Sequence, residues 1–97
     1  MSANQTAKEN DMNTRTDILK EADGLINGPR QEHYGSPAEN FGVIADMWSA
    51  YTNAGITPAD VCHMMTLLKV ARLRNGPHRD SSVDACGYMA LGGELGE

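Results

Sequence analysis

The chain has 97 residues and a formal net charge of −5, which fits one small domain and argues against a protein that binds duplex nucleic acid. No apolar run reaches the roughly 20 residues of a membrane span, and the N-terminus has no signal-peptide pattern, so we expect no membrane association. The two cysteines lack metal-type spacing and are typical of reduced thiols, which predicts a cytoplasmic protein.

The first 14 residues have no apolar periodicity, so we expect a disordered tail over residues 1–14 and a single helical domain over residues 15–97. The first helix is predicted from about Thr16 to Ile26. Its apolar positions recur at helical spacing, at Ile18, Leu19, Ala22, Leu25 and Ile26. The sequence Asn27-Gly28-Pro29 should end this helix.

The second helix has a clear start signal in its sequence. Ser36 is an expected N-cap, Pro37 suits the first helical position, and Glu39 can complete a capping box. One apolar stripe then follows at spacings of three and four, made by Phe41, Ile44, Trp48 and Tyr51. Asn53 and Gly55 should end this helix.

The third helix repeats the same device, with Thr57 as the N-cap, Pro58 next and Asp60 in the third helical position. Its main apolar face is predicted at Val61, Met64, Met65, Leu68 and Ala71. Further apolar residues lie outside that face, at Leu67, Val70 and Leu73. A helix that is apolar most of the way round is central in its fold or lies in a subunit interface, and Asn75-Gly76-Pro77 should end it.

The fourth helix is predicted from Asp80-Ser81 to about Leu91, with Gly92-Gly93 as its end. Gly87 weakens this helix and suggests a close approach by another helix or by a ligand. No segment favours a strand. The chain therefore reads as an all-α, compact antiparallel four-helix unit, and because so small a domain buries little surface we expect it to be oligomeric.

A basic cluster stands out against the acidic background, with Lys69, Arg72, Arg74, His78 and Arg79 close together. Lys69 and Arg72 flank the apolar face of the third helix, and a lysine beside an arginine is the usual pair for binding phosphate. The alternative is a solvated helix end, where cations favour the helix dipole and long side chains reach water.

The loop before the second helix carries Arg30, His33 and Tyr34, which a plain linker would not need. We expect these residues to form a wall of the ligand site that faces Lys69 and Arg72, because a third helix that runs back along the second would bring its far end to this loop. The free N–H groups of the second helix would add donors. In the alternative, Tyr34 closes the end of the bundle and Arg30 pairs with a glutamate.

Asp80 and Asp84 lie one helical turn apart, and two like charges at that spacing call for a cation. That cation could be Mg²⁺, with Glu39 or Asp60 as a third ligand, or it could be Arg79 or Lys69 from a neighbouring helix. The other interpretation treats Glu39, Asp60 and Asp84 as capping acids at the starts of their helices, Asp84 through the S-x-x-D pattern that begins at Ser81.

Between residues 18 and 91 the sequence resembles a family of small phage and prophage proteins that carry a domain of unknown function. The resemblance rests on R-x-x-x-Y-G-x-P-x-x-N-F from Arg30 to Phe41, on I-A-D-M-W, T-P-A-D-V and L-L-K-V-A-R-L, and on D-S-S-V-D-A-C-G-Y from Asp80 to Tyr88. The last helix is also distantly similar to that of MazG-like all-α nucleotide pyrophosphatases, whose acids hold magnesium. That similarity implies a ligand role for Tyr88, but the E-x-x-E helix of those enzymes is missing here.

These observations lead to two expectations from different classes and a third, simpler one. The protein is expected to be a nucleotide-binding protein of MazG-like type, with hydrolysis unproven, no cofactor other than Mg²⁺ and catalytic residues unknown. As a binding-only protein it would serve in counter-defence, by sequestering a nucleotide immune signal or by blocking a host defence protein. The third interpretation is a helical protein–protein interaction module that has no small ligand.

Overall fold

The computed structural model describes the backbone of residues 2–29 and 35–97, and the side chains of residues 14–29 and 35–97. Within these ranges every regular element is helical, which confirms the all-α fold. The elements are α1 (Ser2–Asn27), α3 (Pro37–Thr52), α4 (Pro58–Ala71), the short 3₁₀ helix η1 (Arg72–Asn75) and α5 (Arg79–Leu95). No described helix is long and apolar enough to cross a membrane.

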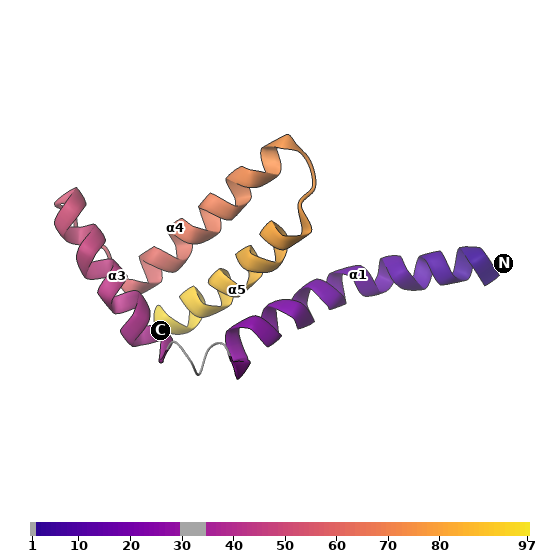
Figure 1. Cartoon of the computed structure of the whole chain (residues 1–97), viewed down its shortest axis with the longest axis horizontal. Helices are drawn as coiled ribbons and strands as arrows, with labels where there is room; N and C mark the ends of the chain where they lie inside the picture. The colour runs from indigo at the N-terminus through magenta and orange to yellow at the C-terminus, as the bar shows by residue number, and fades with distance from the viewer. Residues whose placement is uncertain (1, 30–34) are drawn as a thin grey trace.

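The helices are only partly antiparallel (Figure 1). The helices α4 and α5 form an antiparallel hairpin that η1 closes, as expected. Helix α1 packs on α5 and runs in the same direction. Two contacts show this: Glu21 pairs with Arg79 at the start of α5, and Ile26, later in α1, contacts Gly87, later in α5. The expected antiparallel order is therefore wrong for this pair, whose members are not consecutive in the chain.

Helix α3 crosses α4 instead of lying along it, which corrects the expectation that the third helix runs back beside the second (Figure 1). The connection between them is bound to α3 by one side chain. The Ser49 hydroxyl accepts a hydrogen bond from the Ile56 amide at 2.9 Å and donates one to the Ile56 carbonyl at 3.1 Å. The chain is thus turned back before α4 begins.

Helix α1 begins at Ser2 and not near Thr16. Residues 2–14 contain no glycine or proline, and several are good helix formers, so the backbone can remain helical without an apolar face. This part of α1 extends beyond the other helices (Figure 1). That residues 1–14 lie apart from the domain over residues 15–97 stays a prediction.

The predicted N-caps Ser36 and Thr57 are confirmed, and of the two predicted capping boxes the structure shows the one at α4. The Ser36 hydroxyl accepts a hydrogen bond from the Glu39 amide at 3.1 Å, and α3 ends at Asn53 in the left-handed conformation. At α4 the capping box is complete, since the Thr57 hydroxyl accepts from the Asp60 amide while the Asp60 carboxylate accepts from the Thr57 amide. The backbone hydrogen bond from Thr57 lowers the pKa of Asp60. The ionised carboxylate therefore stabilises the fold, and this stabilisation is lost as the pH falls through the lowered pKa.

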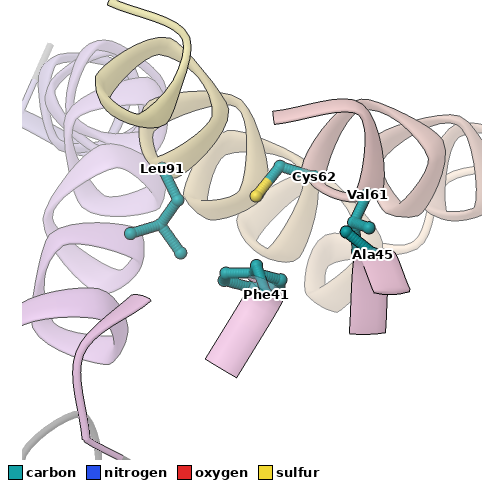
Figure 2. Close-up of a cluster of buried hydrophobic side chains, with 5 residues drawn as sticks. All are labelled: Phe41, Ala45, Val61, Cys62 and Leu91. Atoms are coloured by element: carbon teal, nitrogen blue, oxygen red, sulfur yellow. The ribbon is translucent and has the colours of Figure 1, made fainter. Parts of the chain in front are cut away.

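The buried core lies where α3, α4 and α5 meet (Figure 2). Its members are Phe41 and Ala45 from α3, Val61 and Cys62 from α4, and Leu91 from α5. Burial raises the pKa of the Cys62 thiol, which is therefore neutral at physiological pH. Ala22 of α1 and Val83 of α5 are also buried.

The two glycines on the inner side of α5 serve close helix contacts. A Cβ atom at Gly87 would lie 3.2 Å from Cγ2 of Ile26, so the expected close approach is confirmed and its partner is α1. The expectation that Gly92-Gly93 ends the helix is wrong, because α5 continues to Leu95. Gly92 is buried against α4, where its missing side chain allows the two backbones to approach.

The apolar faces of α3 and α4 are covered only in part. Tyr51, predicted to share the buried stripe of α3, is exposed, and so are Met64 and Leu68 of the predicted main face of α4. The side of α4 that is buried carries Val61 and Cys62. Helix α3 crosses α4 and does not run along it (Figure 1), and large apolar side chains of both helices are exposed.

Candidate functional site

Lys69 and Asp84 join α4 to α5 through an ion pair of 2.9 Å between the ammonium and a carboxylate oxygen. The two residues are neighbours because the hairpin brings the last turn of α4 beside the second turn of α5. The Lys69 side chain is 14% exposed and that of Asp84 is 34% exposed, so the lysine depends more on its partner than the aspartate does. Lys69 is thus the cation that meets Asp84 in the structure, out of the three candidates Mg²⁺, Arg79 and Lys69.

This asymmetry predicts unequal effects of removing each partner. Asp84→Ala should lower the free energy of unfolding by about 1–3 kcal/mol because it leaves a half-buried ammonium without its partner. Lys69→Met should cost less than about 1 kcal/mol, since the aspartate can be hydrated and methionine keeps the packing of the lysine stem. Urea unfolding of both variants measures the difference, and equal losses would contradict it. The double variant should be more stable than Asp84→Ala alone.

An open hollow of about 370 Å³ lies at the turn between α4 and α5. Its lining consists of Arg72, Asn75, Gly76, Pro77 and His78. Gly76 has a φ of 126°, which an L side chain rarely adopts, and this conformation lets the chain turn from η1 toward α5. The hollow therefore lies between Arg72 of the basic cluster and His78, the residue just before α5.

His78 caps α5, a role that the sequence did not indicate. Its Nδ1 accepts a hydrogen bond from the Ser81 amide at 3.2 Å and lies 2.7 Å from the Ser81 hydroxyl. When Nδ1 accepts in this way, the neutral ring carries its hydrogen on Nε2. The S-x-x-D interpretation of Asp84 is wrong, because Ser81 lies in the first turn of α5 and is itself buried.

The remaining basic residues differ in their partners. Arg79 pairs with Glu21 of α1 at 2.9 Å, and both side chains are about half exposed. Arg72 and Arg74 make no ion pair with any described residue. Of the two residues proposed to hold phosphate, Arg72 thus has its charge unpaired beside the hollow, whereas Lys69 is already paired with Asp84.

The predicted metal ligands are spread over three helix starts. Asp80 and Asp84 are on the first turns of α5, while Glu39 and Asp60 belong to the first turns of α3 and α4. Asp60 is nine residues from Lys69 along α4, or about 14 Å at the rise of an α-helix, so it lies far from Asp84. No three His, Cys, Asp or Glu side chains of the described residues form a metal-binding group. The Mg²⁺ prediction rests on Asp80 and Asp84.

Tyr88 packs inside the fold and not at the turn. Its ring meets that of Phe41 edge to face, with centroids 6.2 Å apart and planes at 75°, and it borders the buried core. The predicted role of Tyr88 in the ligand site therefore has no support from its position.

Arg30, His33 and Tyr34 lie outside the described residues. The end of α1 lies beside the middle of α5, where Ile26 contacts Gly87, and Phe41 near the start of α3 packs in one cluster with Leu91 of α5. The turn that carries η1 lies at the opposite end of the α4–α5 hairpin (Figure 1). The reason given for placing the loop opposite Lys69 and Arg72 is thus wrong, because α4 does not run back along α3.

Comparison with known proteins gives a family and two phage relatives. The family described as "Domain of unknown function (DUF6378)" matches residues 17–96. The "Gene 55 protein" of Mycobacterium phage D29 is 47% identical over 72 residues, which cover 73% of this chain and 48% of the relative. The "Gene 55 protein" of Mycobacterium phage L5 is 48% identical over 76 residues, which cover 76% and 49%. The chain thus spans about half the length of these curated relatives, and no solved structure matches it.

Proposed function

This chain belongs to the phage family described as "Domain of unknown function (DUF6378)", and we propose that it binds a phosphate-bearing small molecule at the turn between α4 and α5. One observation carries the proposal: the hollow at this turn is lined by the unpaired Arg72 and by His78, next to the N-terminus of α5. The proposed ligand class is a nucleotide, bound through its phosphates.

Three kinds of donor are available for an anion in this hollow. Arg72 offers a planar guanidinium that can bind two phosphate oxygens at once. At the start of the 17-residue helix α5 the Ser81 and Ser82 amides are bonded to His78, so the helix offers the N–H groups of Arg79 and Asp80 and the positive end of its dipole. His78 has its Nε2–H unused by the cap. Lys69 serves here by holding α4 against α5 through Asp84.

A Mg²⁺ ion and hydrolysis of the bound nucleotide are the two further parts of the proposed function. The MazG-like similarity implies that Asp80 and Asp84 would hold Mg²⁺. Because Asp84 is paired with Lys69, a metal ion would have to displace that ammonium, and Asp80 is the one of the two acids that has no ion pair with a described residue. In the binding-only form the protein acts in the host cytoplasm, where it sequesters a nucleotide immune signal or blocks a host defence protein. Hydrolysis and sequestration differ in one measurement, the release of phosphate or pyrophosphate from a bound nucleotide.

The proposal predicts stabilisation by phosphate ligands that depends on Arg72. Inorganic phosphate, pyrophosphate and mono-, di-, tri- and cyclic nucleotides are tested by thermal shift with and without Mg²⁺. A ligand at 100 times its dissociation constant should stabilise the fold by about 2.7 kcal/mol. Arg72→Ala should abolish this shift, while Arg15→Ala, which removes the same charge from the exposed side of α1, should leave it unchanged. A shift that is equal in both variants would refute binding at the turn.

A second candidate function is favoured by a separate observation, the exposed apolar side chains of α3 and α4. In this interpretation the chain is a helical protein–protein interaction module without a small ligand, and Arg72 and Arg74 are charges at the rim of an interface. The ligand screen separates the two candidates, because an interaction module shows no stabilisation by any phosphate compound.

A further inference from the structure

Two uncovered apolar stripes lie on neighbouring helices. On α3, Val43, Met47 and Tyr51 recur every four residues and are exposed. The stripe on α4 consists of Met64, Leu67 and Leu68, which share one face of the helix and are also exposed. Both helices have well-formed N-caps, so these side chains project from regular helix and not from frayed ends.

The six side chains of the stripes are between 41% and 93% exposed. Large apolar side chains left open on two neighbouring helices are typical of a surface that another molecule covers. A stable dimer buries roughly 800 Å² on each partner, so the contact would include the polar residues around the stripes as well. The α3 stripe extends over about two helical turns and the α4 stripe over about one.

The charges around the stripes are complementary within the same chain. Helix α3 carries Glu39 and Asp46 and has no lysine or arginine. The far end of α4 and η1 carry Lys69, which is paired with Asp84, and Arg72 and Arg74, which make no ion pair with a described residue. Every copy thus has an apolar stripe beside acidic residues on α3 and another beside arginines at the end of α4. A surface that carries both can bind a second copy of itself.

We propose that a second copy of this chain covers these stripes, with α3 of each copy packed on α4 of the other around a two-fold axis. The two-fold axis makes the α3-to-α4 contact twice in the dimer. Both stripes of both copies are then covered, so the assembly stops at two copies. It leaves the Lys69–Asp84 pair intact within each copy. The inference does not depend on the proposed ligand.

The first test is the molecular mass in solution. Light scattering in the micromolar range should give about 21 kDa, twice the 10.5 kDa of one chain. Leu67→Glu should raise the dimer dissociation constant at least tenfold. Leu19→Glu is the matched control, because Leu19 is 61% exposed on α1 and Leu67 is 66% exposed on α4, and it should leave the constant unchanged. Circular dichroism checks that both variants keep their helicity.

The second test identifies which helices meet. Met47→Cys and Leu67→Cys, each in a Cys86→Ser background, are oxidised separately and as a mixture. The proposed pairing predicts a disulfide-linked dimer chiefly in the mixture. Linkage of each variant to itself alone would overturn the α3-to-α4 pairing. A monomer at every concentration, or a dimer that Leu67→Glu does not weaken, would overturn the interface itself.

Discussion

Replacement of Phe41 by alanine is expected to lower the free energy of unfolding by about 3–5 kcal/mol. Phe41 lies in the cluster where three helices meet (Figure 2). Its ring also packs edge to face against that of Tyr88. The variant would therefore lose the transfer energy of a large side chain and leave a cavity between helices. This is a large part of the roughly 5–15 kcal/mol that stabilises a typical domain.

Tyr51→Ala is the matched control, since it removes an aromatic ring from the same helix at a position that is 93% exposed. In the monomeric state this change should alter the free energy of unfolding by less than about 0.5 kcal/mol. Urea unfolding at low protein concentration compares the two variants. Similar losses for Phe41→Ala and Tyr51→Ala would mean that the face of α3 has been assigned wrongly.

The second large effect is expected at Gly92. A Cβ atom there would lie 3.0 Å from Cβ of Cys62 and 3.0 Å from the ring of His63, so a larger side chain must push α5 away from α4. Gly92→Val should lower the free energy of unfolding by about 1–3 kcal/mol through overpacking. The loss arises although valine replaces a residue that is itself unfavourable in a helix.

Gly93 provides the control for this prediction, because a Cβ atom at that position would meet nothing within 4 Å. Gly93→Ala should raise the free energy of unfolding by up to about 1 kcal/mol, the difference in helix propensity. Thermal and urea unfolding of the two neighbouring variants should thus change in opposite directions. If Gly92→Val is also stabilising, the close contact between α4 and α5 is not present in solution.

Of the ligand-binding residues that the sequence suggested, the proposed site at the turn includes Arg72. Arg72 lines the hollow and makes no ion pair with a described residue, while Lys69 is paired with Asp84. Tyr88 packs on Phe41, so among the described residues of the hollow the imidazole of His78 is the one aromatic ring on which a base could stack. The proposed recognition therefore concerns phosphate more than the base.

The sequence by itself determined where α3 and α4 begin and that no described segment is a strand. The signals at Ser36, Thr57 and Asp60 act over three residues, and the hydrogen bonds they predict form within a single turn of helix. Such contacts are decided by neighbours in the chain, which is why they could be predicted without any knowledge of how the helices pack.

Only the tertiary structure decided which apolar residues are covered and which charges are paired. Tyr51 and Phe41 follow the same periodicity, yet one is exposed and the other is buried, because α3 crosses α4 instead of lying along it. In the same way, Gly92 reads as a helix end in the sequence and becomes a contact once α5 lies against Cys62. Helix crossings depend on side chains far apart in the chain, and periodicity reports only which positions can be buried.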